Sequence, residues 1–157
     1  MSNPTGDALA HSSLKLKASS PEWVNTVSLA QSEVLKTPQL PVVTEHVFHA
    51  GMYARTVRIP AGVWVTGVVM KIPTLLVIHG VAMFKTEDGD IALEGFGVLP
   101  GSAGRQTILV AYSDVEMTMI FPTQAKTVAE AEAEFTDQVE MLVSRHSTSD
   151  TIVVTGE

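Results

Sequence analysis

Hydrophobic and polar residues alternate with a period of two over the middle of the chain, in short runs that turn residues separate. The runs cover residues 46–50, 52–59, 64–72, 75–84, 91–99, 106–113 and 115–121. Turn signals recur about every 8 to 12 residues, and the strongest is Asp88-Gly89, a dipeptide typical of hairpin turns. About seven or eight short strands spaced in this way predict an antiparallel sandwich or barrel, not a parallel α/β sheet.

Before this region, the spacing of apolar residues predicts a helix over residues 21–35. Ser20 can cap its free N–H groups, and Pro21 suits its first turn. The apolar stripe of this helix consists of Trp23, Val27, Ala30 and Val34. Because such a stripe has to pack on another surface, it contacts either the chain's own barrel or a neighbouring subunit.

A second helix is predicted over residues 128–143, where Thr127 and Glu130 form a capping-box pattern. Its apolar stripe consists of Val128, Ala131, Phe135, Val139 and Leu142. The acids expected on its other face are Glu130, Glu132, Glu134, Asp137 and Glu140. We expect this face to be solvated, with a docking surface for a basic partner as the alternative. In the tail, residues 151–155 have a strand-like pattern that could add an edge strand to a neighbour.

The chain therefore divides into three parts. Residues 1–43 form an N-terminal arm with the first helix, residues 44–122 form the barrel, and residues 123–157 form the second helix and a tail. Residues 1–19 are polar and lack an apolar period, so we expect a mobile or partner-bound arm there. The predicted fold class is mainly β, a single antiparallel barrel flanked by two helices.

Composition and charge narrow the possible partners. The 17 acidic and 10 basic residues give a net charge of −7, which argues against binding to nucleic acid phosphates. No run reaches the roughly 18 apolar residues of a membrane helix, so no membrane partner is expected. The absence of cysteine excludes disulfides and thiolate sites.

Two stretches carry a family resemblance: residues 60–80, PAGVWVTGVVMKIPTLLVIHG, and residues 98–109, VLPGSAGRQTIL. They resemble the two motif stretches of cupins, in which three His and one acid bind a divalent metal inside the barrel. The resemblance implies a cupin-like jelly roll over about residues 45–122. Aligned on Gly62, the ligand positions hold Val68, Met70, Pro73 or Thr74, and Arg105. Because these side chains are poor donors to divalent metals, we expect neither a metal cofactor nor a metal-dependent enzyme.

A narrower resemblance lies in residues 45–62, EHVFHAGMYARTVRIPAG, and residues 86–89, TEDG. These resemble small cupin-like proteins encoded by tailed phages, and several virion decoration and cement proteins are also small jelly rolls. Our leading hypothesis is therefore a non-catalytic capsid decoration or cement protein of the virion, a homo-oligomer that binds the major capsid protein or other virion proteins. The expected partner contacts are Trp23, Val27 and Val34.

Two alternative functions remain open. One is a metal-free cupin enzyme or a binding protein for a sugar or carboxylate, because guanidinium groups suit carboxylates. Its candidate pocket residues are Tyr53, Arg55, Arg105 and Tyr112. The other is a tail or fibre accessory module that binds a glycan through Trp64, although we expect Trp64 in the core.

The barrel interior separates the structural role from the ligand-binding role, since a ligand needs converging polar groups and space. The residues expected to point inward and to fill the interior are Val68, Met70, Leu76 and Ile78. His46 and His49 are predicted to be surface or rim residues on opposite faces of a strand. His79 is predicted to be a structural histidine at a strand end.

Overall fold

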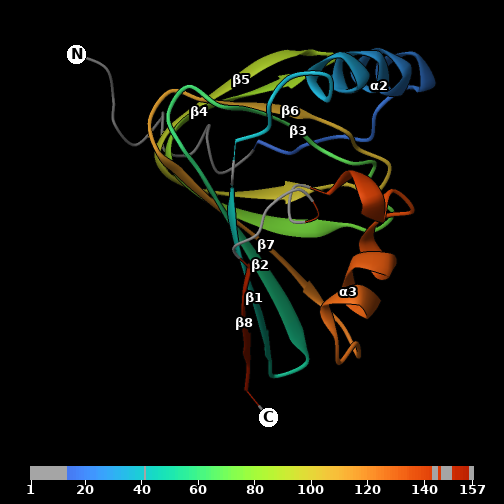
Figure 1. Ribbon diagram of the computed structural model, residues 1–157, viewed down its shortest axis with the longest axis vertical. Coiled ribbons are helices and arrows are strands. Elements are labelled where there is room, and N and C mark those ends of the chain that lie inside the picture. Colours follow the sequence, from blue (N-terminus) through green and yellow to red (C-terminus); the bar gives the residue numbers. More distant parts are fainter. Residues whose placement is uncertain (1–13, 41, 143–144, 146–149, 156–157) are drawn as a thin grey trace.

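The alternating segments form strands of one curled sheet in a computed structural model, which describes residues 14–40, 42–142, 145 and 150–155 (Figure 1). The strands are β1 (Val43–His49), β2 (Met52–Ile59), β3 (Trp64–Thr66), β4 (Thr74–Thr86), β5 (Gly89–Gly101), β6 (Ile108–Ala111), β7 (Val115–Pro122) and β8 (Asp150–Val154). The helices are α2 (Pro21–Val34), α3 (Val128–Phe135) and a short 3-10 helix, η1 (Val139–Met141). The predicted fold class, mainly β with two flanking helices, is confirmed, and the predicted antiparallel barrel is a curled, mixed sheet.

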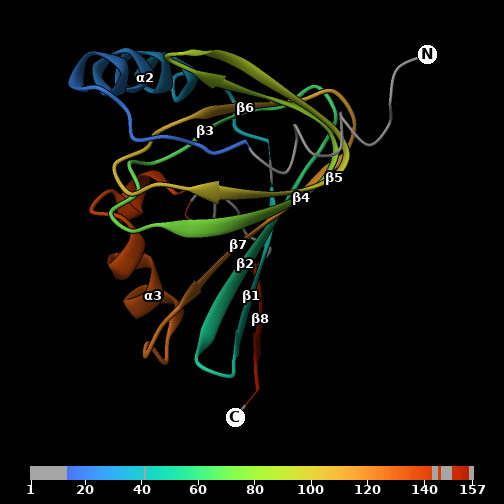
Figure 2. The ribbon, with the colours of Figure 1, turned by 180° about the vertical axis from the view of Figure 1, so that it is seen from behind.

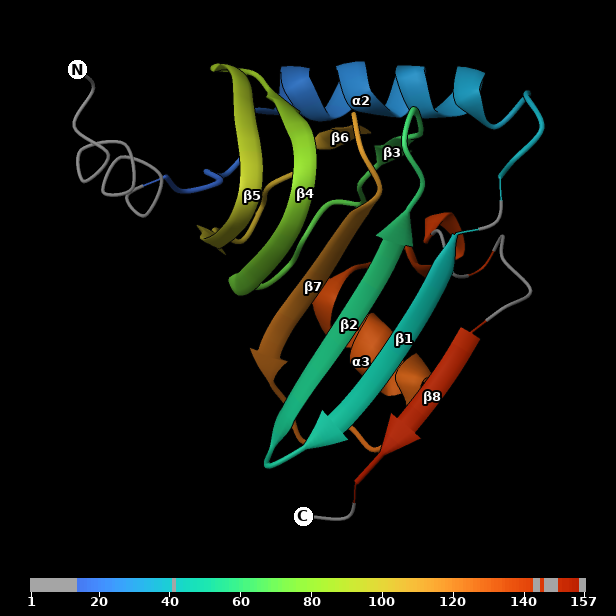
Figure 3. The same cartoon turned by 90° about the vertical axis from the view of Figure 1, so that its left-hand side faces the viewer.

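The strand order is β3-β6-β4-β7-β2-β1-β8, and β5 pairs with the other edge of β4. Neighbouring strands are antiparallel except for β8, which runs parallel to β1. Figure 3 shows β7, β2, β1 and β8 side by side, with α3 behind them. The predicted tail strand therefore pairs within its own chain, and it makes the sheet mixed.

Strand β4 bends the sheet at Gly80. Residues 75–79 of β4 pair with β7, whereas residues 82–85 pair with β6. On its other edge β4 pairs with β5 along its whole length, and Gly80 lies opposite Gly95. Gly80 has a φ of 129° and approaches the turn between β6 and β7 so closely that a Cβ atom would lie 2.6 Å from the Asp114 carbonyl oxygen. The bend lets one continuous strand serve both halves of the curled sheet.

The alternation predicted from the sequence separates the two faces of the sheet. On β4, Leu76, Ile78 and Phe84 are buried. Leu75, His79 and Val81 of the same strand point outward and are exposed. The four residues predicted to point inward are all buried: Val68, Met70, Leu76 and Ile78. The core therefore lies on the concave side of the sheet.

Helix α2 confirms the predicted helix to within one residue, and the Ser20 side chain accepts the backbone N–H of Trp23. The indole Nε1 of Trp23 donates to the carbonyl oxygen of Gln106 at 2.8 Å, and Val27 is fully buried. The apolar stripe thus packs on the chain's own domain. Of the predicted partner contacts, Val27 is inaccessible, Trp23 is half-buried and Val34 is 37% exposed.

The predicted arm packs against the same part of the fold where it is described. Residues 1–13 lie outside the described residues. Leu16 is buried, and its backbone N–H donates to the carbonyl oxygen of Pro100 at 2.9 Å. Its carbonyl oxygen accepts the N–H of Ser102 at 2.8 Å. The end of the arm is therefore part of the domain, in contrast to the expectation of a mobile or partner-bound arm.

The second helix is shorter than the sequence predicts. Helix α3 ends at Phe135, because Thr136 is extended and its hydroxyl donates to the carbonyl oxygen of Val69 at 2.9 Å. The Gln138 side chain accepts the N–H of Val69 at 2.9 Å. These long-range bonds hold the chain in an extended path that leads to η1. Residue 143, the predicted helix end, lies outside the described residues. Figure 2 shows α3 and α2 on the same side of the molecule.

Three aromatic or histidine positions also differ from expectation. His46 is fully buried, not on the surface, and its Nδ1 lies 2.7 Å from the Tyr53 hydroxyl. Trp64, expected in the core, is 56% exposed, and Lys85 Nζ lies 5.5 Å from the centre of its ring. His79 lies inside β4, not at its end. No helix in the described ranges is long and apolar enough to cross a membrane.

The bend at Gly80 generates the first prediction. Gly80→Ala should lower the free energy of unfolding by about 2 kcal/mol or more, because the substitution adds backbone strain to a steric clash with Asp114. Urea denaturation measures this change. Gly97→Ala on β5 is the matched control, since its Cβ would meet only the Leu93 side chain at 3.9 Å, and it should change stability by less than about 0.5 kcal/mol. Equal effects of the two substitutions would contradict the role of the bend.

Candidate functional site

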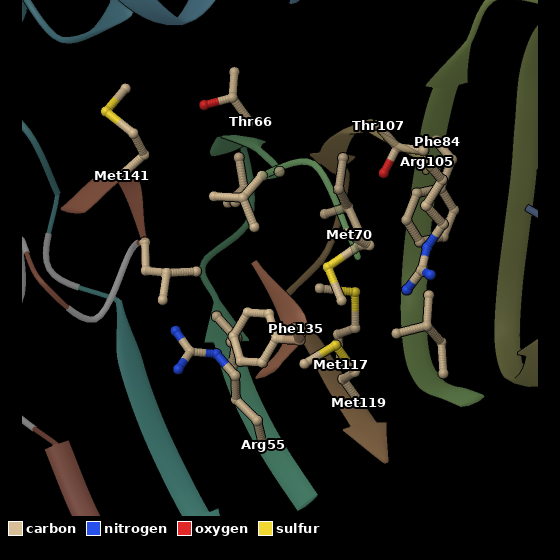
Figure 4. Close-up of a pocket in the computed structure, with 17 residues that line it drawn as sticks. Arg55, Thr66, Met70, Phe84, Arg105, Thr107, Met117, Met119, Phe135 and Met141 are labelled. Carbon is tan, nitrogen blue, oxygen red and sulfur yellow. The ribbon is translucent and has the colours of Figure 1, made fainter. Parts of the chain in front are cut away.

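A pocket of about 120 Å³ opens on the concave side of the sheet (Figure 4). Strands from both halves of the sheet line it, together with α3 and η1. Most of its wall is apolar, from Val57, Val65, Val68, Met70, Leu76, Phe84, Leu109, Met117, Met119, Phe135, Met141 and Leu142. Its polar side chains are Arg55, Thr66, Arg105 and Thr107. The inward residues therefore do not fill the barrel completely, which corrects the expectation from the sequence.

Three of the positions that align with cupin metal ligands lie together in this pocket. Val68, Met70 and Arg105 line it. Thr74, at one of the two positions considered for the acid, accepts a hydrogen bond from Arg105 Nη2 at 2.6 Å. Within the described ranges, no three His, Asp or Glu side chains gather where they could hold a metal ion. The absence of a metal cofactor stays a prediction.

Arg105 is buried, with 4% of its surface exposed, and neighbouring groups fix the position of its guanidinium. Its Nη1 donates to the carbonyl oxygen of Ser102 at 3.0 Å. The guanidinium lies directly over Gly101, where a Cβ atom would be 2.5 Å from Arg105 Cζ. The carbonyl oxygen of Arg105 also accepts the N–H of Met70 at 3.0 Å. Glycine at 101 and the pairing with residue 70 therefore fix the position of this cation.

The charge of Arg105 is not balanced by a carboxylate in the part of the chain that the structure describes. Burial lowers the pKa of Arg105 to about 10, because removing a cation from water disfavours its charged form. At neutral pH the guanidinium is still protonated. The pocket thus contains a buried positive charge whose described contacts are neutral oxygen atoms.

Arg55, the second guanidinium of the pocket, belongs to a buried ion cluster. Its Nη1 lies 3.2 Å from Glu132 Oε2, and Glu132 Oε1 lies 2.7 Å from Arg145 Nη2. Arg55 also lies over the ring of Phe135, with 5.8 Å between Cζ and the ring centre. This cluster joins β2 to α3. Figure 4 shows Arg55 and Arg105 on either side of the labelled methionines Met70, Met117 and Met119.

Glu132 is the site residue that the sequence analysis missed. The helical pattern predicts a solvated acidic face for Glu132, but only 1% of this residue is exposed. A signal was present, because Val128, Ala131, Glu132 and Phe135 have the spacing i, i+3, i+4 and i+7 of one helix face. An acid on the apolar side of a helix indicates a buried partner of opposite charge.

The structure brings together two of the four residues suggested for a pocket. Arg55 and Arg105 both line it. Tyr53 is buried elsewhere in the core, where its hydroxyl meets His46. Tyr112 is 60% exposed and does not line the pocket.

Comparisons with known proteins concern the fold. No protein-family model matches the chain, and no curated protein matches it. A cupin-superfamily protein from Desulfitobacterium hafniense shares 16% identity over 59% of this chain and 87% of its own, with a TM-score of 0.46. A cupin domain of an XRE family transcriptional regulator from Enterobacter cloacae shares 12% identity over 53% of this chain and 99% of its own, with a TM-score of 0.44.

The third similar structure is an enzyme, a salicylate 1,2-dioxygenase from Pseudaminobacter salicylatoxidans. It shares 12% identity over 78% of this chain and 40% of its own, with a TM-score of 0.48. An enzyme and a regulator domain thus occur among the similar structures, and likeness at this level carries no argument about activity. The phage origin inferred from the narrower resemblance is not supported by these similarities and stays a prediction.

The ion cluster generates the second prediction. Glu132→Gln should lower the free energy of unfolding by roughly 3 kcal/mol, because it removes the carboxylate that faces the buried guanidinium of Arg55. Chemical denaturation measures the loss. Glu140→Gln, which removes an exposed acid nearby, should change stability by less than about 0.5 kcal/mol.

A double substitution sharpens the same test. Arg55→Met combined with Glu132→Leu should recover part of the stability lost in Glu132→Gln, because apolar side chains of similar size can replace a buried ion pair. If Glu132→Gln is as stable as Glu140→Gln, the cluster does not hold α3 to the sheet.

Proposed function

We propose that the protein binds a small, largely apolar molecule on the concave side of its curled sheet. The observation that carries the proposal is the apolar pocket of about 120 Å³ with two buried guanidinium groups in its wall. Binding sites for small molecules are typically concave and mostly apolar, with a few fixed polar groups that orient the ligand.

The size of the pocket limits the ligand. A dry cavity of about 150 Å³ lined by aliphatic and aromatic side chains can bind benzene, so the present pocket suits a body of about six heavy atoms. Methionine side chains are flexible and adapt to different shapes, and four of them line the wall. Larger ligands then require these methionines to move.

We propose a binding role without catalysis. Val68 and Met70 occupy two positions at which the cupin resemblance implies metal ligands, and neither side chain can transfer a proton. Glu132, a carboxylate near the pocket, already forms ion pairs with Arg55 and Arg145. These features favour a site that holds a molecule and does not transform it.

Capsid decoration is the second candidate function, and the exposed apolar residues on the convex side of the sheet favour it. Phe96 is 69% exposed, Val98 40% and Leu75 43%. Val98 lies two residues from Phe96 on β5 and diagonally across from Leu75 on β4. An apolar surface of this kind could attach to a virion shell or to other subunits of a homo-oligomer.

The third prediction tests ligand binding by thermal unfolding with benzyl alcohol, hexanol, benzoate and hexanoate. At least one compound should raise the midpoint temperature in a saturable manner, because binding to the folded state alone stabilises it. Met117→Trp, which puts a larger side chain into the pocket, should abolish the shift. Val98→Trp, on the convex side of the sheet, should keep it.

No shift with any of the four compounds would contradict a pocket for molecules of this size. An equal loss in Met117→Trp and Val98→Trp would show that the compounds bind outside it.

Decoration has its own test, which is co-sedimentation of the purified protein with tailed-phage capsids that lack it. The decoration hypothesis expects saturable binding at a fixed number of copies per shell, and Phe96→Asp should weaken it. An absence of binding to the capsids would count against capsid decoration and would not affect the proposal that the pocket binds a small molecule.

A further inference from the structure

We infer that the pocket is selective for a carboxylate: the ligand is a small apolar carboxylic acid whose anionic group binds Arg105. This inference rests on the proposed function and specifies its ligand class. It follows from the difference between the two guanidinium groups in the pocket wall.

Arg55 needs no anion from a ligand, because Glu132 already faces it at 3.2 Å. Arg105 is equally inaccessible to bulk water, with 4% of its surface exposed against 5% for Arg55. Its described partners are the Thr74 hydroxyl and the Ser102 carbonyl oxygen, which carry no charge. Of the two cations, Arg105 is therefore the one that an anionic ligand would neutralise.

Burial of a cation without an anion is costly, so such groups in folded proteins are normally paired or bound to a ligand. Arg105 lines the apolar pocket, where an anion would be shielded from water and the attraction between the charges would be strong. A bound carboxylate would thus offset the unfavourable free energy of burying the Arg105 cation without an anion.

The guanidinium of Arg105 is also preorganised for a carboxylate ligand. Thr74, Ser102 and the backbone of Gly101 fix its position. The two hydrogen bonds use two of the five N–H groups that a guanidinium carries, and its planar shape can bind a carboxylate through two parallel hydrogen bonds. Fixing the donor in advance lowers the entropy that binding costs.

The rest of the pocket accepts the apolar body of the acid. Met70, Phe84 and Leu109 line the pocket together with Arg105. Among the described residues that line it, the remaining polar side chains are two threonines and Arg55, so a sugar with many hydroxyl groups would find few partners. The chemistry favours a benzoate-like or short aliphatic acid.

The test compares benzoate with benzamide by isothermal titration calorimetry on the full-length protein. The two compounds have similar size and shape but differ in charge. Benzoate should bind on the order of tenfold to a hundredfold more tightly, because a hydrogen bond between charged groups contributes more than one between neutral groups. Hexanoate and hexanamide form a second matched pair.

Three variants locate the selectivity at Arg105. Arg105→Met removes the charge, and Gly101→Ala keeps the charge but takes the space in which the guanidinium lies. Both should reduce the preference for benzoate over benzamide by at least about tenfold. Arg58→Met, which removes an arginine paired with Glu45 and Glu116 outside the pocket, should keep it.

The outcomes separate this inference from the proposed function. If benzoate and benzamide bind the unsubstituted protein equally, or Arg105→Met keeps the preference, the carboxylate assignment is wrong while ligand binding stands. If neither the two acids and two amides nor the two alcohols of the thermal-unfolding test bind, ligands of this size are excluded and the proposed function fails with the inference. Should Arg105→Met not fold, the matched pairs on the unsubstituted protein and Gly101→Ala still decide.

Discussion

The long hairpin of β4 and β5 is the constraint on which the rest of the structure depends. A thirteen-residue strand has to pair with β7 through its first half and with β6 through its second half, and it can do so only by bending at Gly80. The bend curls the sheet and gives it a concave side. Because the inner residues of both halves converge there, the fold creates an apolar interior that α3 and η1 help to enclose.

Charge then distinguishes the two ends of that interior. On one side Glu132 neutralises Arg55 and joins α3 to β2, so this cation contributes to the architecture. On the other side Arg105 is fixed by neutral oxygens and by the close approach of Gly101. The same residue type therefore has two roles, and the presence of a described carboxylate partner separates them. A curled sheet whose concave side holds one cation without a described carboxylate partner thus offers an anion a position that Arg55 does not offer.

The sequence predicts the strands and α2 well, because alternation, turn residues and the Ser20 cap are local signals. It fails where distant contacts decide. The end of α3 depends on the hydrogen bonds of Val69 with Thr136 and Gln138, and the burial of His46 depends on Tyr53 across the hairpin. The suitability of guanidinium groups for carboxylates makes Arg105 a pocket candidate from the sequence, but its lack of a described acidic partner is a property of the folded chain. Glu132 could have been found from its spacing within the apolar stripe.

The central claim is that the concave side of the sheet holds a small carboxylic acid, and a crystal structure of the protein with 4-bromobenzoate tests it most directly. Anomalous scattering from bromine locates the ligand independently of the shape of the electron density. The account predicts one bromine site among the pocket methionines, with the carboxylate oxygens within hydrogen-bond distance of Arg105. A pocket without bromine at saturating ligand, or a carboxylate that points away from Arg105, would contradict it.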